Sequence, residues 1–286
     1  MKKLFYCLLS VLFIIPPMFA QNNMVQINVM TFNIRLDHEG DGDNQWTFRK
    51  DFAADVVKFY QADLIGTQEV LHHQLTDMLD RLPDYAHLGV GREDGMTKGE
   101  YSAILYKKDR FDVVRSGTFW LGEDITAVGV KGWDAACERV ATWAVFTDKK
   151  TGKDFFMLNT HFDHIGKVAR RESSLLLLSQ VEKLAGKLPI IVTGDFNATP
   201  EDEPIKILTD TNDSRHLTPS RSIAALRYGP EWTFHNFGRI PFERRNWIDY
   251  IFVKGDIKAL SNGVITDTKN HLFPSDHCPV IATLIF

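Results

Sequence analysis

The spacing of apolar residues along the chain predicts an alternation of short strands and amphipathic helices. Alternating or continuous apolar runs, rich in β-branched and aromatic residues, predict strands over 26–34, 63–69, 102–106, 111–119, 139–147, 154–161, 189–193, 247–253, 263–267 and 280–286. Apolar positions at helical spacing predict helices over 48–60, 71–82 and 168–184. Strands outnumber helices, and helices occur in both halves. We therefore predict an α/β fold, a four-layer sandwich in which two mixed β-sheets pack face to face with helices outside.

The composition agrees with one large core. Of the 286 residues, 44% are hydrophobic and 24% are charged, which is ordinary for a globular protein. The sequence contains no repeat of fixed period, no low-complexity stretch and no linker rich in Pro, Gly or Ser. We predict a single domain over residues 21–286.

The first twenty residues differ from the rest of the chain. Lys2 and Lys3 precede an apolar run over 4–15, and two prolines and the sequence Met18-Phe19-Ala20 follow it. A basic start, a short apolar run and a small residue at the cleavage point are typical of a secretory signal. The run is shorter than the roughly 20 residues that span a bilayer. We predict a signal peptide over 1–20, export to the periplasm or the extracellular space, and no membrane anchor after cleavage; a buried N-terminal helix or strand is the alternative.

Removal of this segment changes the charge and the cysteine count. Cleavage after Ala20 removes two lysines and no acid, which leaves 31 basic and 37 acidic residues and a net charge of −6. Nucleic-acid binders usually carry a basic surface because phosphate contacts dominate their affinity, so we expect no stable nucleic-acid complex. Separately, we expect the protein to be a monomer. Cys137 and Cys278 remain, and they either pair or stay as separate thiols.

Polar side chains suited to chemistry follow the apolar runs. Five motifs stand at the ends of predicted strands, namely Thr31-Phe32-Asn33, Thr67-Gln68-Glu69, Asn159-Thr160-His161-Phe162-Asp163-His164, Gly194-Asp195-Phe196-Asn197 and Ser275-Asp276-His277. Asp249 adds one more acid inside the strand over 247–253. Charged residues are rarely buried unless they are paired or bind metal. Several of them emerging from separate strands predict a common site at one edge of the sheets.

Each motif alone also has a structural explanation. Asn33 is suited to an Asx turn, Glu69 to capping the helix that follows it, and the stretch 194–197 to a tight turn. The histidines and Asp249 equally suit ordinary hydrogen-bonded positions. The order of all the motifs along one chain is much harder to explain in this way.

Together and in this order, the motifs resemble those of the endonuclease/exonuclease/phosphatase superfamily. The resemblance runs from about residue 28 to the C-terminus, and its strongest parts are 194–197 and 275–277. The stretch 33–46 resembles a secreted bacterial subgroup of this superfamily. The resemblance implies two β-sheets between helices, a site at one rim, and a metal-dependent hydrolase that acts on phosphoric esters.

The resemblance also implies a metal site. Glu69 would be the principal ligand, with Asn33 and Asp276 close to the ion. Mg²⁺ is the implied ion and Mn²⁺ the alternative. This is physically reasonable, because a hard cation held by a carboxylate and water is the arrangement that Mg²⁺ prefers.

Further roles implied by the resemblance concern the water and the phosphate. Asp195 would orient or deprotonate the attacking water, and Asn197 would hold that water or the phosphate. Asp249 would fix one tautomer of His277, which would contact a non-bridging phosphate oxygen, and His161 would stabilise the phosphate or assist the leaving group. In-line attack develops charge on the phosphate oxygens, so cations and donors must be in place beforehand. The general base is either Asp195 or the pair of His277 and Asp249.

Some residues depart from the nuclease pattern. Arg35 stands where many nuclease members have an acid, and His161 where apurinic endonucleases have tyrosine. Both features, with the acidic composition, argue against an abasic-site repair enzyme. Arg170 and Arg171 begin the helix after the His161 motif, and we predict that they bind a substrate phosphate, since Arg suits phosphate oxygens. A solvated helix terminus is the alternative.

The sequence therefore predicts an exported Mg²⁺-dependent phosphoester hydrolase, a phosphodiesterase or phosphatase, that acts by metal-assisted in-line attack of water. One alternative is an extracellular nuclease that supplies nucleotides or phosphate, and another is a sphingomyelinase-like lipid phosphodiesterase. A non-catalytic binding module is the alternative of another class, and the presence of Glu69, Asp195 and His277 argues against it. The partner is a phosphoester whose identity the sequence does not give.

Overall fold

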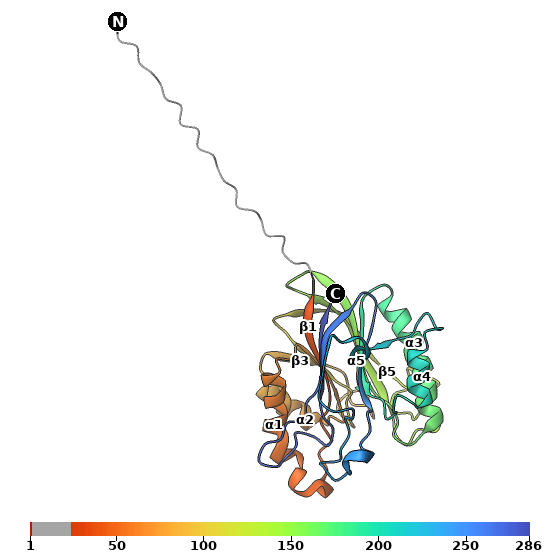
Figure 1. Ribbon diagram of the computed structural model, residues 1–286. Coiled ribbons are helices and arrows are strands. Elements are labelled where there is room, and N and C mark those ends of the chain that lie inside the picture. Colours follow the sequence, from red (N-terminus) through yellow and green to blue (C-terminus); the bar gives the residue numbers. More distant parts are fainter. Residues whose placement is uncertain (2–23) are drawn as a thin grey trace.

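The computed structural model describes Met1 and residues 24–286. Apart from Met1, the predicted signal peptide lies outside the described residues. Figure 1 shows two sheets side by side in the centre, with helices on both outer flanks. The predicted four-layer α/β sandwich is confirmed.

The first sheet is mixed and has seven strands. In order across the sheet, they are β10 (Leu226–Tyr228), β12 (Lys258–Val264), β13 (Val280–Ile285), β1 (Gln26–Asn33), β2 (Leu64–Gln68), β4 (Ile104–Lys107) and β3 (Tyr85–Leu88). The pairs β1–β2 and β10–β12 are parallel, and the other pairs are antiparallel.

The second sheet is also mixed and has six strands. In order, they are β5 (Phe111–Trp120), β6 (Val140–Asp148), β7 (Lys153–His161), β8 (Ile190–Asp195), β11 (Asp249–Lys254) and β9 (Thr218–Pro219). Only β7 and β8 run parallel among these pairs. The two central strands, β7 and β8, therefore end at the same rim.

Helices cover the outer faces of both sheets. Helices α1 (Trp46–Phe59) and α2 (His72–Arg81) flank the first sheet, and α3 (Lys167–Ala185) and α4 (Glu203–Thr209) flank the second (Figure 1). The short elements are η1 (Glu39–Asn44), α5 (Ser220–Ile223) and η2 (Phe242–Arg244). One apolar core lies between the sheets and extends beneath α3, and another lies beneath α1 and α2.

The predicted elements agree with the structure except where the local signal is weak. The strand predicted over 263–267 is wrong, because β12 spans Lys258–Val264. The polar and small residues Ser261, Asn262 and Gly263 hide its period-two pattern, yet Asn262 and Gly263 are paired with β13. The short elements β3, α4, β9, α5 and β10 were not predicted, since each has too few residues to show a period.

Strand alternation places the polar motifs between the sheets. In β1, Ile27 and Val29 belong to the core between the sheets, whereas Met30 and Phe32 lie in the core beneath the helices. Because successive side chains point to opposite faces, Asn33 continues the inward series at the strand end. Because the same alternation holds in the other strands, polar residues at inward positions of the strand ends meet at one rim.

A buried polar link joins the two sheets just below this rim. The Asn159 side-chain amide donates to the Thr67 carbonyl oxygen at 2.8 Å, and its Oδ1 accepts from Gln68 Nε2 at 2.7 Å and from Thr193 Oγ1 at 3.0 Å. Gly66 makes this approach possible: a Cβ there would lie 2.1 Å from Thr193 Oγ1. The link fixes the distance between the strands that carry the polar motifs.

Candidate active site

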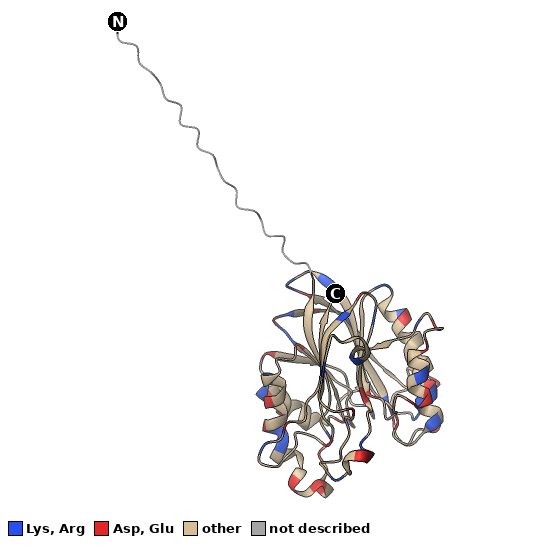
Figure 2. Cartoon of the chain, viewed as in Figure 1, with Lys and Arg blue, Asp and Glu red and all other residues tan. Residues whose placement is uncertain are grey.

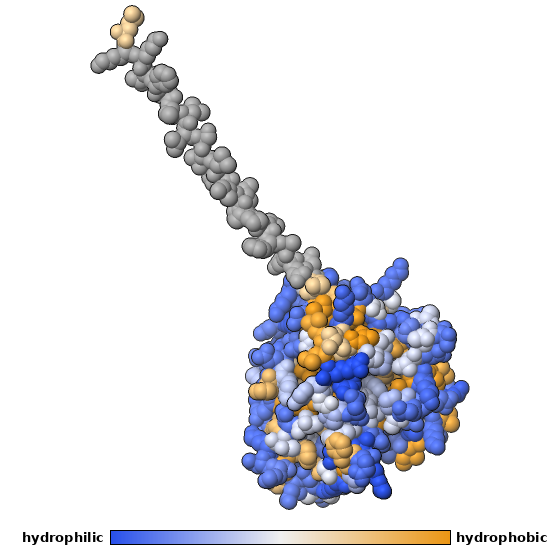
Figure 3. Space-filling model, viewed as in Figure 1, coloured by the Kyte–Doolittle hydropathy of each residue, from blue (hydrophilic) through white to orange (hydrophobic). Residues whose placement is uncertain are grey.

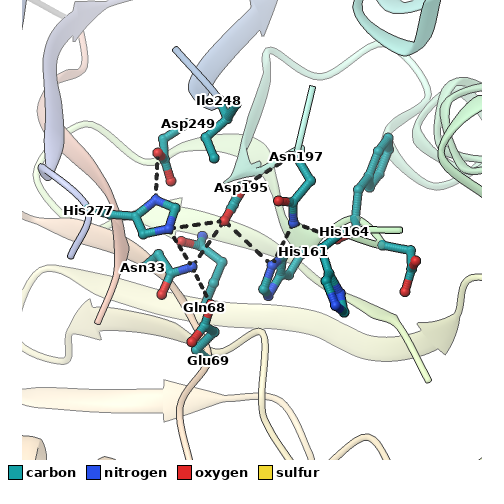
Figure 4. Close-up of polar contacts among 12 residues, drawn as sticks. Asn33, Gln68, Glu69, His161, His164, Asp195, Asn197, Ile248, Asp249 and His277 are labelled. Carbon is teal, nitrogen blue, oxygen red and sulfur yellow. Dashed lines mark hydrogen bonds and ion pairs between the residues drawn. The ribbon is translucent and has the colours of Figure 1, made fainter. Parts of the chain in front are cut away.

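The structure brings eight of the ten predicted site residues together at one rim of the sheets, although they come from most of the chain. They are Asn33, Glu69, His161, Asp195, Asn197, Asp249, Asp276 and His277. Figure 4 labels all of them except Asp276. A cavity of about 280 Å³ opens here, and six of the eight line it. The other two, Asn33 and Asp249, lie behind the lining and hold it by hydrogen bonds.

His277 is held between two acids. Its Nδ1 lies 2.9 Å from Asp249 Oδ2, and its Nε2 lies 3.7 Å from Asp195 Oδ2. Burial alone would lower the pKa of His277, but the charges of Asp249 and Asp195 raise this pKa well above its usual value. His277 is therefore an imidazolium that presents an Nε2–H donor at the cavity.

Asp195 lies at the centre of the site and is completely buried. Its Oδ2 accepts from Asn33 Nδ2 at 3.0 Å, and its Oδ1 accepts from the Asn197 backbone N–H at 2.9 Å. Burial and the neighbouring charge of Asp249 raise the pKa of Asp195 to about 7. A carboxylate with this pKa is suited to take a proton near neutral pH.

His161 is in the opposite charge state from His277. Burial and the nearby guanidinium groups of Arg139 and Arg92 lower the pKa of His161 well below its usual value. Its Nε2 lies 3.0 Å from Asn197 Nδ2, which is a donor, so the proton of the neutral ring is on Nδ1. The site thus holds one charged and one neutral histidine on either side of Asp195.

Glu69 reaches the site through an unusual backbone turn. Its φ of 60° lies in the left-handed region, and this breaks the alternation of β2 directly after the strand ends. Glu69 Oε1 accepts from Asn33 Nδ2 at 3.0 Å, and Oε2 accepts from the Leu36 N–H at 3.1 Å. Burial would raise the pKa of Glu69, but His277, Asn33 and Arg35 lower it, so this carboxylate is ionised.

A larger cavity of about 560 Å³ lies elsewhere, between α4, α5 and the start of β11. None of the predicted site residues lines it. Trp247 and Tyr250 do, beside Arg221. The smaller cavity is the better candidate for catalysis, because the titratable groups with shifted pKa values converge there.

The model of the Endonuclease/Exonuclease/phosphatase family matches residues 30–277, and this range includes every predicted site residue. The chain belongs to this family. Membership places it among proteins whose family name denotes the cleavage of phosphate esters.

Relatives of known structure cover nearly the whole chain. An endonuclease/exonuclease/phosphatase from Bacteroides vulgatus is 43% identical, with a TM-score of 0.88 over 91% of this chain and 98% of its own. A mannosyl-6-phosphatase from Bacteroides thetaiotaomicron is 38% identical, with a TM-score of 0.86 over 91% of this chain and 100% of its own. Human Nocturnin is 26% identical over 91% of this chain and 65% of its own length. The chain spans about two thirds or less of the curated relatives it matches.

The carboxylates of this family member fit a divalent metal ion. One carboxylate oxygen each from Glu69 and Asp195 lie within 4.8 Å of one another and of a ring nitrogen of His277, which as an imidazolium is a neighbour of the ion and not a ligand. Two carboxylates in this group suit a hard cation, and Asp276 lines the same cavity. Asn33 is oriented differently from a ligand, because its Oδ1 accepts from the Arg35 N–H at 3.0 Å and its Nδ2 faces Glu69. Its predicted metal contact stays a prediction and requires the amide to turn.

The structure does not bring Arg170 and Arg171 to the cavity. Arg170 Nη1 donates to the Asp163 carbonyl oxygen at 2.8 Å, and Arg171 forms ion pairs with Glu172 and Glu203 on the outer helices. Neither residue is among those that line the cavity. Their role in substrate binding stays a prediction without geometric support. Their surroundings agree with the alternative, in which both arginines belong to a solvated helix terminus.

One wall of the cavity is formed by residues to which the sequence patterns assign no role. The residues that form it are Arg92, Glu100, Cys137, Arg139 and His164. Arg92 and Glu100 lie in an irregular polar loop and Arg139 precedes β6, so no motif marked these three. His164 ends the 159–164 motif, but no role was assigned to it. Among the described residues, Cys137 and Cys278 are both free thiols, which decides between the two alternatives for them.

Proposed function

We propose that this chain is an exported, Mg²⁺-dependent hydrolase of phosphate esters, with Mn²⁺ as an alternative ion. The observation that carries the proposal is the placement of buried Asp195 between charged His277 and neutral His161. A base with a pKa near 7 and a fixed cationic donor are the groups that water attack on a phosphate needs.

The residues divide the reaction between them. Asp195 takes a proton from the attacking water, whose oxygen forms the new bond to phosphorus while the bond to the leaving oxygen breaks. Nε2–H of His277 stabilises a non-bridging oxygen, and Asp249 keeps this ring charged and oriented. Asn197 lines the same cavity, and its side-chain amide holds the ring of His161 at 3.0 Å. A metal ion held by Glu69 and Asp276 would supply Lewis-acid stabilisation of the phosphate oxygens.

Two observations favour a phosphatase that acts on a small molecule. The cavity of about 280 Å³ is slightly smaller than the roughly 300–1,000 Å³ usual for ligand sites. Along the ribbon in Figure 2, positions of Lys and Arg alternate with positions of Asp and Glu. The mannosyl-6-phosphatase at 38% identity supports the same choice. A nuclease is the second candidate, favoured by the family name.

A substrate panel tests this proposal. The protein without its first 20 residues should release phosphate from mannose 6-phosphate and p-nitrophenyl phosphate with Mg²⁺ or Mn²⁺, and not with a chelator. Bis-p-nitrophenyl phosphate, RNA and plasmid DNA are the diester arms, and His277→Ala is the inactive control. Turnover of the diesters alone would make the protein a nuclease or phosphodiesterase. Turnover of nothing would favour a binding module.

Export and assembly are part of the proposal. The N-terminal sequence pattern supports cleavage near Ala20, and none of the helices in residues 24–286 has the length and hydropathy of a membrane span. Hydrophilic residues dominate the face in Figure 3, although apolar residues gather near the top of the folded part. We extend the proposal to a monomer without a stable nucleic-acid partner, in keeping with the acidic composition. Mass spectrometry of the cell-envelope and extracellular fractions should find no intact Met1 start, and size-exclusion chromatography should find one chain per particle.

A further inference from the structure

One wall of the active-site cavity has no part in the mechanism above. We call Arg92, Glu100, Arg139 and His164 the polar wall. It lies beside His161, while the groups that act on the phosphate, Asp195 and His277, also line the cavity. A wall in that position faces whatever group the phosphate is attached to.

The guanidinium groups of the polar wall are already paired with carboxylates. Arg92 forms a two-pronged ion pair with Glu100, at 2.8 Å from Nη1 to Oε2 and 2.6 Å from Nη2 to Oε1. Arg139 Nε lies 3.4 Å from Asp163 Oδ2. Hydrogen bonds from backbone N–H groups, together with the charge of Arg139, keep the Asp163 carboxyl ionised although burial opposes this. Burial raises the pKa of Glu100, and Arg92 opposes this rise. The wall therefore offers no unpaired positive charge to a second phosphate.

The polar wall nevertheless has hydrogen-bond donors to spare. Arg92 Nε and Arg139 Nη1 are buried and have no partner among the described residues. The Arg139 side chain is only 5% exposed, so water does not compensate these N–H groups freely. Arg92, Glu100, Arg139 and His161 line the cavity, and the same four residues also border a gap that is too narrow to admit a water molecule.

Neutral groups that both donate and accept hydrogen bonds are the ligands that suit the polar wall. A hydroxyl oxygen accepts from a guanidinium N–H while its hydrogen is donated to a carboxylate such as Glu100. Adjacent hydroxyls on a ring would satisfy an arginine–glutamate pair at both of its members. His164 adds an N–H, because its Nδ1 lies 3.0 Å from Arg139 Nη2 and accepts from it, which leaves the proton on Nε2.

We propose that the polar wall is the leaving-group subsite and binds the hydroxyl groups of a sugar that carries the scissile phosphate. This inference rests on the proposed function, since it assumes that the phosphate occupies the side of the cavity with Asp195 and His277. It makes Arg92, Glu100 and Arg139 specificity-determining residues, separate from those that cleave the ester. The products are inorganic phosphate and the free sugar.

Equilibrium binding without turnover tests the subsite. Calorimetry with chelator-treated protein should show that mannose 6-phosphate binds at least about tenfold more tightly than inorganic phosphate, because a site built for hydroxyls discriminates strongly against a ligand that lacks them. In Glu100→Gln and Arg139→Lys, this advantage should fall below about threefold, with phosphate affinity unchanged within about twofold.

A matched control is available in the chain. Arg221 and Glu231 form another two-pronged pair, at 3.2 and 2.6 Å, outside this cavity. Glu231→Gln makes the same chemical change as Glu100→Gln and should keep the full advantage of the sugar phosphate. Thermal unfolding identifies a variant that is not folded, and the charge-conserving Arg139→Lys then carries the test.

Three results would overturn the inference. Wild-type protein that binds mannose 6-phosphate no better than phosphate has no sugar subsite. Equal loss of both ligands in the wall variants would assign the wall to the phosphate itself. Much tighter binding of fructose 1,6-bisphosphate, lost in the same variants, would make it a second anion site. If the sugar advantage is present but no ester is hydrolysed with Mg²⁺ or Mn²⁺, the proposed function fails and the subsite remains.

Discussion

The hydrogen bond between His277 and Asp249 offers the sharpest test of the proposed chemistry. Asp249→Asn keeps the size of a side chain that is only 1% exposed, but it removes the charge 2.9 Å from His277 Nδ1. The asparagine can also present its amide nitrogen to the ring, which would favour the wrong tautomer. The substitution therefore removes the cause of the charge on His277 while it leaves the cavity intact.

The size of the effect follows from Coulomb's law. Two charges about 4 Å apart interact by about 4 kcal/mol at an effective dielectric constant of about 20, which is about three pKa units. Burial, which lowers the pKa of His277, would then be opposed mainly by Asp195. The pKa of His277 should fall, and the ring should lose much of its charge and of its role as a cationic donor. Loss of one preorganised donor costs about 10²- to 10³-fold in kcat.

Steady-state kinetics on p-nitrophenyl phosphate at pH 7 and saturating Mg²⁺ measures the fall in kcat of Asp249→Asn. We expect kcat to fall about 10²- to 10³-fold while KM stays within about threefold. The control is Asp148→Asn, which changes an equally buried acid that pairs with Arg110 at 3.3 Å at the far end of β6. This control should lose stability and keep its kcat. A kcat of Asp249→Asn within about fivefold of wild type would refute the role of the pair.

Three further predictions concern the metal, pH and packing. Glu69→Gln should raise the Mg²⁺ concentration needed for half-maximal activity, and excess metal should restore part of the rate, whereas His277→Ala should not respond to metal; equal rescue of both would contradict these assignments. Burial lowers the pKa of His235 to about 3, so the unfolded chain binds a proton more readily below pH 6.5, and about 2 kcal/mol of unfolding free energy should be lost between pH 7 and 5. Urea unfolding should find this loss absent in His235→Gln, and identical pH dependence in both proteins would show that His235 is not responsible. Gly66→Ala should lower the unfolding free energy by about 3 kcal/mol, because its Cβ would lie 2.1 Å from Thr193 Oγ1, and a change below about 0.5 kcal/mol in urea unfolding would mean that the sheets separate easily.

The architecture and most of the site follow from patterns that are local in the sequence. Period-two alternation assigns each strand residue to a face, and a polar residue at the inward end of an apolar strand has nowhere to lie except the rim. Asn33, His161 and Asp195 are such residues, so their meeting was predictable once two packed sheets were expected. Glu69 was predictable from its motif alone, because its left-handed backbone breaks the strand pattern.

The charge states of the histidines and the far wall of the cavity depend on how distant segments pack. His161 and His277 both follow short polar motifs, yet one is neutral beside two arginines and the other is charged between two acids. Arg92 and Arg139 carry no local pattern, because a loop residue's neighbours depend on how distant segments pack. Arg170 shows the converse, since its place after the His161 motif suggested a substrate contact that the direction of α3 does not provide. Local periodicity encodes which face a residue occupies, whereas pKa values and pocket walls depend on long-range contacts that one segment does not contain.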